Sequence, residues 1–328
     1  MSTNELFEKV IRTTEVSAGG GGLLNAEQSN RFIDYMWDAT VLAGEGRQVR
    51  MRANTLDIDK VGVGQRLARL ATEAVDDGVN ADATFTKVSV TTKKLRLDWE
   101  LSRESLEDNI EGNDLEDHIA RLMATQFGND IEDLAINGDT TLSSDALLKS
   151  FDGFRKLGLA GGTVKTNSGA TITKSTLNTA LKAMPRKYLQ RRGDLRFYVG
   201  SGLSQDYLNS FLSLPGNPEE VVSGLIRGNG ALQGPAGAVT PFGFGVPIKE
   251  VPLFSETLTG TYSGATGNHG YAELTFPQNR IWGIKREVQV MSEYKPKKDA
   301  IEYTAYVRVG VQYENTDALV IVKDIKVA

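Results

Sequence analysis

The feature that most constrains the fold is a long run of residues with the apolar spacing of an α-helix, between residues 113 and 136. Apolar side chains recur at steps of three and four, which places them on one helix face. They are Leu115, Ile119, Leu122, Met123, Phe127, Ile131 and Leu134. Asn113 is placed to cap the start, with Glu116 three residues later, and Asn137-Gly138 should end the helix in a left-handed turn.

At about 1.5 Å per residue this helix would span roughly 35 Å. It lies between a strand-rich segment and a mixed α/β region, so we interpret it as a structural spine that joins two unlike regions. The period alone is also that of an ordinary core helix.

Composition excludes several classes of protein. The chain of 328 residues has no cysteine, so disulfides, thiolate chemistry and cysteine-based metal sites are not available. Its net charge of −5 argues against a protein whose main task is to neutralise phosphates. No apolar run approaches the ~20 residues of a membrane-spanning helix, and the N-terminus lacks a signal-peptide pattern. We therefore expect a soluble cytosolic product with no membrane partner.

Residues 1–46 are expected to form an arm rather than a domain. Four consecutive glycines at 19–22 break regular structure, since glycine carries the highest ordering cost. The short helix expected over Ala26–Trp37 carries an apolar patch that includes Phe32 and Trp37. Such a segment is suited to crossing a surface and docking elsewhere. The alternative is a flexible tail followed by a packed first helix.

Residues 47–100 alternate polar and apolar side chains and predict a long two-stranded ribbon with an elaborate tip. A two-stranded ribbon is marginal alone in water, so we expect support from outside its own domain. Gly62-Val63-Gly64 resembles the start of a dinucleotide-binding loop, but Leu67 stands where the third glycine should be, which argues against a nucleotide site. The ribbon flanks are rich in positive charge: Arg47, Arg50, Arg52, Lys87, Lys93, Lys94 and Arg96.

The region 140–275 is predicted to be mixed α/β. A helix should start at Thr173 and stop at Gly193, followed by a buried strand over Leu195–Val199 and a helix over Ser204–Leu212. Leu225–Gly245 is rich in glycine and predicts a long loop, and such loops are usually functional or make contacts.

The remainder of the chain is predicted to be rich in β-structure. Pro247 and Pro252 remove ladder donors, which makes the strand that contains them an edge-type strand. From Tyr271 onward we expect two strands up to residue 294, a long strand over 300–316 and a buried last strand over 318–327.

The sequence offers little for catalysis. His118 and His269 have no motif around them and are expected to be satisfied surface histidines. Seven carboxylates, five on the predicted spine and two just before it, cluster at helical spacing, and a solvated helix face explains them. They are Glu107, Asp108, Glu116, Asp117, Asp130, Glu132 and Asp133. No HExxH, GxSxG or EF-hand pattern occurs. We therefore predict no catalytic, cofactor or metal site and no enzymatic activity.

The order of the elements is more informative than any single motif. It resembles that of the Hong Kong 97-type (HK97-like) major capsid protein of tailed bacteriophages over nearly the whole chain. The local matches are ELSRESLED at 100–108, IEDLAINGD at 131–139, ALKAMPRKYLQRRGDLRFYVGSGLSQDYL at 180–208, RIWGIKREVQVMSEY at 280–294 and YTAYVRVGVQYENTDALVIVKDI at 303–325.

The resemblance implies an α+β capsid fold and a division of the chain. Residues 1–46 would be the N-terminal arm and 47–100 the extended loop, a β-ribbon. Residues 101–190, with the spine helix, and 275–328 would form the peripheral domain, and 191–274 the axial domain.

The implied function is self-assembly, as hexamers and pentamers, into an icosahedral head shell around double-stranded DNA bound without sequence specificity. Localisation would be the virion, after assembly in the host bacterial cytoplasm. A portal would be a partner, as would a separate scaffolding protein, because only a short arm precedes the ribbon. The alternative with the same fold is an encapsulin nanocompartment, which holds a cargo enzyme. A more distant alternative is an α+β enzyme or binding module.

Ten residues are candidate assembly contacts. The aromatic patch of the arm, the charged ribbon and the glycine-rich loop, assigned to the centre of each capsomer, supply them: Phe32, Trp37, Arg50, Arg52, Lys60, Lys94, Arg96, Arg227, Gly230 and Phe242. Some relatives crosslink a ribbon lysine to a peripheral-domain asparagine. That region here reads Lys297-Lys298-Asp299, and neither Lys60 nor Asn315 falls on a matching motif, so crosslinking is not expected.

Overall fold

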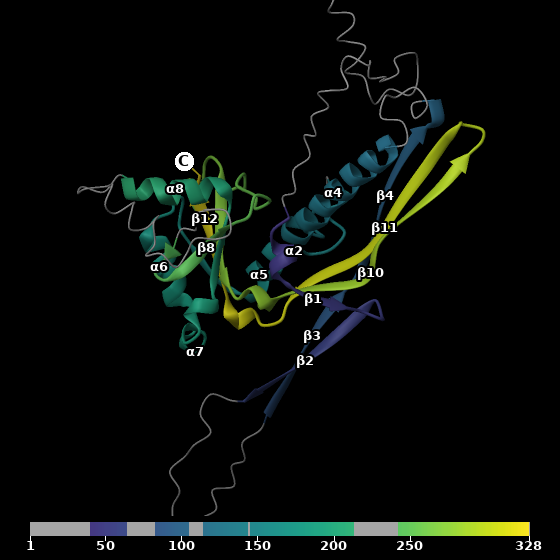
Figure 1. Cartoon of the computed structure of the whole chain (residues 1–328). Helices are drawn as coiled ribbons and strands as arrows, with labels where there is room; N and C mark the ends of the chain where they lie inside the picture. The colour runs from purple at the N-terminus through teal and green to yellow at the C-terminus, as the bar shows by residue number, and fades with distance from the viewer. Residues whose placement is uncertain (1–39, 64–82, 105–113, 144, 213–241, 328) are drawn as a thin grey trace, which may run out of the picture.

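The computed structural model describes residues 40–63, 83–104, 114–143, 145–212 and 242–327. Figure 1 shows a sheet flanked by short helices on one side of the molecule and a longer sheet beside helix α4 on the other. A two-stranded ribbon extends away from both. The predicted α+β class is confirmed. The glycines at 19–22, the helix at 26–37 and most of the loop at 225–245 lie outside the described residues.

The smaller region is built on a six-stranded sheet in the order β5-β12-β9-β6-β8-β7. Its strands are β5 Thr163–Thr166, β6 Arg196–Val199, β7 Phe242–Gly243, β8 Val246–Glu250, β9 His269–Thr275 and β12 Leu319–Lys326. Helices α6 Lys174–Ala183 and α8 Ser201–Leu212 contribute Leu177, Leu181 and Leu203 to its core. The predicted buried strand and second helix are therefore confirmed. Since β5, α6 and β12 belong here too, this region is not confined to residues 191–274.

The helix predicted to run from Thr173 to Gly193 ends earlier than expected. Thr173 and Thr176 form a capping box at its start, as helix-starting threonines commonly do. Pro185 then interrupts the helix, because the residue before a proline is forced into an extended backbone, as at Met184. A separate turn, α7 Arg186–Leu189, and a 3₁₀ turn, η2 Arg192–Asp194, follow.

The end of the predicted glycine-rich loop forms a tight hairpin instead. Strands β7 and β8 pair antiparallel, and Phe244 and Gly245 between them have φ of 55° and 81°. Two positive φ values in a two-residue connection are typical of a type I′ turn. Strand β8 pairs with β6 over its last three residues, Ile248–Glu250, and with the two-residue β7 through Val246 and Pro247, so it is nearly the edge strand predicted.

The larger region is a four-stranded sheet in the order β1-β10-β11-β4. Its strands are β1 Arg47–Arg50, β4 Lys93–Ser102, β10 Arg280–Lys295 and β11 Ala300–Tyr313. The predicted spine is confirmed as α4, Asp114–Asn137, which packs on one sheet face through Phe127 and Leu134. Towards the helix N-terminus, Ile119, Leu122 and Met123 are only half-buried.

The end of α4 corrects one prediction. Gly138 does not adopt a left-handed backbone. The glycines of the described chain that have a positive φ do not include it. Its N–H donates to the Leu134 carbonyl at 2.9 Å, which continues the helical pattern. Glycine is needed here for space, because a Cβ would lie 2.5 Å from the Phe151 carbonyl oxygen where the chain folds back towards α5, Phe154–Gly161.

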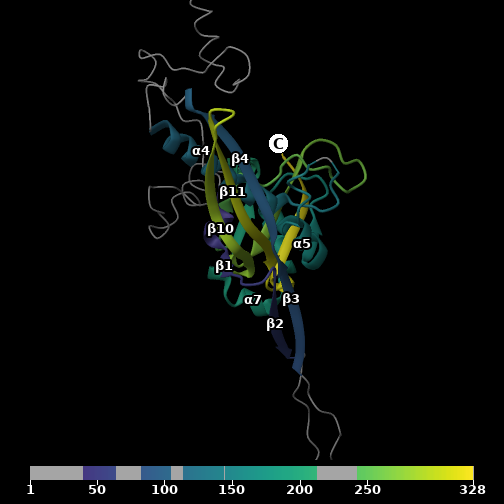
Figure 2. The ribbon, with the colours of Figure 1, turned by 90° about the vertical axis from the view of Figure 1, so that its right-hand side faces the viewer.

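The ribbon is shorter than predicted. Strands β2 Thr55–Val63 and β3 Ala83–Thr91 pair antiparallel over nine residues each (Figure 2). Strands β1 and β4, which lie at the two ends of the range predicted for the ribbon, instead pair with β10 and β11. The change of sheet occurs at the buried Thr92, whose N–H donates to the Asn54 carbonyl at 2.8 Å.

Candidate assembly surfaces

The base of the ribbon rests on two glycines of the four-stranded sheet. Gly283 and Gly310 lie directly opposite each other in β10 and β11. A Cβ on Gly283 would lie 2.5 Å from the sulfur of Met51, and a Cβ on Gly310 would overlap the Thr91 carbonyl oxygen. Met51 and Val90 form a small buried cluster on this platform with Ile281. The glycine pair therefore sets how closely the ribbon approaches the sheet.

The same sheet face carries a row of cations beside the ribbon base. Lys94, Arg308 and Arg286 lie opposite one another on β4, β11 and β10. The Lys94 ammonium lies 3.9 Å from the centre of the Tyr306 ring, and the Arg286 guanidinium lies 5.7 Å from it, which are cation–π distances. Arg308 donates to the side chain of Asn54. The row links the ribbon to the sheet.

A row of carboxylates lies on the same sheet face, six residues away along β4 and β11. Glu100, Glu302 and Glu293 are opposite one another on β4, β11 and β10, about 20 Å from the cations at ~3.4 Å per residue. The Lys298 ammonium donates to Glu100 at 2.9 Å and to Glu302 at 3.0 Å. Hydrogen bonds to Glu100 and Glu302 raise the pKa of Lys298, and the bond from Lys298 lowers the pKa of Glu302. The sheet face therefore carries a row of cations near the ribbon and, near the β10–β11 turn, a row of carboxylates that Lys295 and Lys298 neutralise in part.

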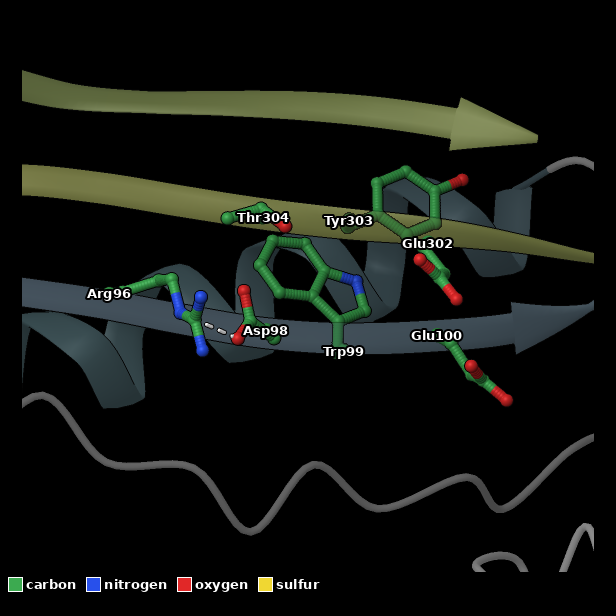
Figure 3. A pocket seen from close by; sticks show the side chains of 7 residues that line it. All are labelled: Arg96, Asp98, Trp99, Glu100, Glu302, Tyr303 and Thr304. Carbon is green, nitrogen blue, oxygen red and sulfur yellow. Dashed lines mark ion pairs between the residues drawn. The ribbon is translucent and has the colours of Figure 1, made fainter. Parts of the chain in front are cut away.

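An open cavity of about 510 Å³ lies at the edge of the sheet formed by β4 (Figure 3). Trp99 and Tyr303 stack inside it with ring centres 5.3 Å apart, and Arg96 pairs with Asp98 at 2.8 Å. The carboxylates of Glu100 and Glu302 project at one end of the aromatic pair. Both carboxylates already pair with Lys298, and Tyr303 is 5% exposed, so the protomer itself supplies the cation next to this aromatic pair.

A second open cavity, about 670 Å³, lies between the ribbon and the six-stranded region. Lys60 reaches it from β2, beside Tyr188, Phe276 and Asn315. The Asn315 side chain donates to the Tyr188 hydroxyl at 2.6 Å and accepts from the backbone N–H of Asp317 at 3.1 Å. Both ends of this amide are therefore engaged within the protomer.

The start of the described chain is anchored to α4 by a buried carboxylate. Glu132 accepts hydrogen bonds from the N–H groups of Val41, Leu42 and Ala43 at 2.7, 2.8 and 3.1 Å. These bonds satisfy the free donors at the start of helix α2, Leu42–Glu45. The prediction that the acidic residues of the spine are all solvated is thus wrong at Glu132, which is 1% exposed. The arm enters the fold at this point.

One of the two histidines is buried, although both were expected on the surface. His269 is 1% exposed rather than on the surface, and its Nε2 lies 2.9 Å from the Tyr262 hydroxyl. His118 is half-buried on α4. Among the described residues no group of three or more histidines and carboxylates could hold a metal ion. No helix among them is long and apolar enough to cross a membrane.

The sequence-predicted contact residues do not form one cluster. Lys94 and Arg96 share the polar face of β4, whereas the exposed Arg50 and Arg52 flank the end of β1. Lys60 lies in the second cavity and Phe242 in β7 of the other sheet. Four candidates lie outside the described residues: Phe32, Trp37, Arg227 and Gly230. The carboxylate row and the glycine platform depend on cross-strand register, which the sequence pattern does not report.

These features define a class of protein. A spine helix on an extended sheet, a projecting two-stranded ribbon and a second sheet region on one chain are the Hong Kong 97-type capsid fold. Solved structures agree: the capsid of an empty GTA particle matches with a TM-score of 0.61 and 13% identity over 92% of this chain and 95% of that chain. An encapsulin complex from Synechococcus elongatus PCC 7942 matches with a TM-score of 0.57 and 9% identity over 93% and 97%.

One curated relative narrows the identification. YqbE of Bacillus subtilis (strain 168), which carries the name of a prophage capsid protein, is 28% identical over 325 residues, covering 97% of this chain and 99% of the relative. No family model matches the chain. The chain therefore has the fold of the Hong Kong 97-type capsid proteins and is similar to a prophage capsid protein along nearly its whole length.

Proposed function

We propose that copies of this chain assemble, as hexamers and pentamers, into the icosahedral head shell of a tailed bacteriophage and enclose its double-stranded DNA. The observation that carries the proposal is the end-to-end similarity to YqbE together with the shared fold. Assembly would take place in the cytoplasm of the host bacterium, with a portal and a separate scaffolding protein as partners.

The projecting ribbon is consistent with a shell in which each copy stabilises the ribbon of its neighbour. Strands β2 and β3 pair only with each other in the described chain, and a two-stranded ribbon is marginal in water. Its ion pair between Asp57 and Lys87, at 2.5 Å, is exposed and contributes little. A neighbouring protomer that covers the ribbon supplies the missing burial. Many modest contacts, repeated by symmetry, then hold the shell.

The charge balance supports a container rather than a DNA-binding protein. The chain carries 42 acidic and 37 basic residues, so the shell itself does not neutralise the enclosed phosphates. Small cations would do so, and contacts with DNA would be weak and independent of sequence.

Electron microscopy of the expressed protein, alone and with its neighbouring phage genes, tests the proposal. Closed particles hundreds of ångströms across are expected, and particles from infected or induced cells should contain nuclease-protected DNA. An encapsulin is the second candidate because the fold is shared with the Synechococcus protein. Particles that enclose a single enzyme and no DNA would establish that function, and a soluble monomer under all conditions would exclude both.

A further inference from the structure

Half of strand β10 forms an edge that no other strand of the described chain covers. Strand β1 pairs with β10 only from Ile281 to Ile284. Two register shifts follow, between Ile284 and Gln289, and beyond them β10 pairs with β11 alone. The segment 289–295, here called the β10 edge, therefore leaves one row of backbone donors and acceptors without a strand partner in the described chain. Such a row is a template for pairing with another strand.

The β10 edge also exposes apolar side chains. Val290, Met291 and Tyr294 are 51%, 52% and 45% exposed, and they are three of the five large hydrophobic residues exposed in the described chain. The residues opposite them on β11 are more buried, since Ala305 is 2% exposed and Thr304 and Ile301 are half-buried. Solvent exposure is thus a property of the edge strand and not of the whole sheet. Clustered exposed apolar groups on a soluble protein mark an interaction surface.

We propose that the β10 edge pairs antiparallel with the β10 edge of a second copy, about a two-fold axis at Ser292. The inference rests on the proposed function, which brings copies together. In this register Val290 faces Tyr294 of the other copy, which is a favourable pair of a β-branched and an aromatic side chain. Glu293 faces Met291, and Lys295 faces Gln289, so no like charges are directly opposite.

The charges on the edge are compatible with this contact. Glu293 is already paired with Lys295 of its own strand at 2.7 Å. A contact of two seven-residue strands buries far less than the roughly 1,200 Å² of a stable interface. The pairing is therefore too small to hold a dimer in solution, and it forms where other contacts of the shell bring the edges together. A two-fold contact of this kind uses the same patch on both copies.

A single cysteine tests the axis, because the chain has none of its own. Opposite residues of an antiparallel pair have Cα atoms about 4.5–5.5 Å apart, within the range of a disulfide. Assembled Ser292→Cys particles should give disulfide-linked dimers on mild oxidation, seen on a non-reducing gel. The matched control is Asp98→Cys, exposed on the opposite edge of the same sheet, which should remain monomeric.

A second pair of variants tests the register. Met291→Cys and Glu293→Cys should each give few dimers alone, whereas particles assembled from a mixture should give many, because each faces the other across the axis. Absence of Ser292→Cys dimers in intact particles, or equal crosslinking of Asp98→Cys, overturns the inference. That outcome is distinct from failure of the proposed function, in which the unmodified chain forms no particles at all.

Discussion

Glu273 and Arg280 form an ion pair across the joint between the two sheets, with 2.9 Å between Oε2 and Nη2 and both side chains 1% exposed. Glu273 belongs to β9 of the six-stranded sheet, and Arg280 is the first residue of β10. The guanidinium lies 3.8 Å from the centre of the Tyr198 ring, and the Tyr313 hydroxyl donates to Glu273 at 2.7 Å. Burial is the largest single influence and works to lower the pKa of Arg280, but the charge and hydrogen bond of Glu273 together with the neighbouring Tyr313 and Tyr198 outweigh it, and the pKa is raised.

Removing one member of this pair should be strongly destabilising. Arg280→Met leaves the Glu273 carboxylate buried without its cation, and breaking a buried pair in this way costs about 3–5 kcal/mol. Urea unfolding of the isolated protomer, followed by circular dichroism, measures the loss.

The double variant Glu273→Leu with Arg280→Met is the control for that experiment. It removes both charges, so the protomer should regain most of the stability that Arg280→Met loses, since apolar replacement of a buried pair is often neutral. A double variant as unstable as the single one would show that packing of the Arg280 side chain, and not its charge, holds the joint.

The glycine platform predicts an effect of adding one methyl group. Gly310→Ala places a Cβ against the Thr91 carbonyl oxygen, which belongs to the backbone and cannot rotate away. Overpacking of this kind costs roughly 1–3 kcal/mol and should displace the ribbon. Gly193→Ala is the matched control because a Cβ there meets no atom within 4 Å. Equal unfolding midpoints for the two variants would disprove the close approach.

The Glu132 cap predicts a local effect on the arm. Glu132→Ala leaves three backbone N–H groups of α2 without an acceptor, at a cost of roughly 2–3 kcal/mol. Hydrogen exchange at Leu42 and Ala43 should accelerate more than exchange in β12. Asp130→Asn is the control, because Asp130 accepts only from the exposed side chain of Gln126 among the bonds the structure shows. It should change stability by about 0.5 kcal/mol or less.

The end of α4 predicts a dependence on pH. Lys156 lies 2.6 Å from Asp139 and 2.9 Å from Asp152. Its hydrogen bond, with those from Thr141, holds the pKa of Asp139 well below the usual range. A lowered folded-state pKa stabilises the protein above the unfolded pKa, near 3.9, and this contribution is lost as pH falls through the folded value.

Lys156→Met should remove the part of this contribution that Lys156 supplies, which is about 1 kcal/mol or less for a partly exposed pair. Thermal unfolding of the two proteins should therefore differ at pH 7, and the difference should shrink progressively as the pH falls below about 4. A difference that stays constant over this range would assign the effect of Lys156 to packing of its side chain.

The sequence predicts what depends on local period. Helix α4 was expected within one residue of its observed bounds, because Phe127, Ile131 and Leu134 repeat at helical spacing. The ribbon was expected too long, because segments on both sides of Thr92 alternate polar and apolar residues. The alternation breaks at the polar run 91–94, where the apolar positions shift from Val88 and Val90 to Leu95 and Leu97, and the chain changes sheets there. Alternation shows that a segment is a strand but not which strand is its partner.

Contacts between distant segments have no local signal. Glu132 looks like its solvated neighbours on α4 until α2, about 90 residues earlier, is placed against it. The pairing of Gly283 with Gly310 likewise depends on a register that two bulges in β10 alter. The candidate assembly surfaces were therefore predictable as charged segments, and their geometry was not.

The last prediction concerns the ribbon, which should be needed for assembly and dispensable for folding. Ile58 and Val88 are directly opposite in β2 and β3, so replacing residues 59–87 by Asn-Gly closes the strands with a two-residue turn. The platform contacts of Met51 and Val90 are kept. The shortened protomer should keep its unfolding midpoint and nearly all of its circular dichroism spectrum, because the removed strands pair only with each other and Lys60 lies at the open rim of the second cavity. It should form no shells, since the surface that reaches a neighbour is gone.

Replacing only residues 64–82 by Asn-Gly between Val63 and Ala83 separates the role of the tip from that of the strands. Normal shells from the variant that lacks 59–87, seen by electron microscopy, would show that the ribbon does not hold neighbouring copies together.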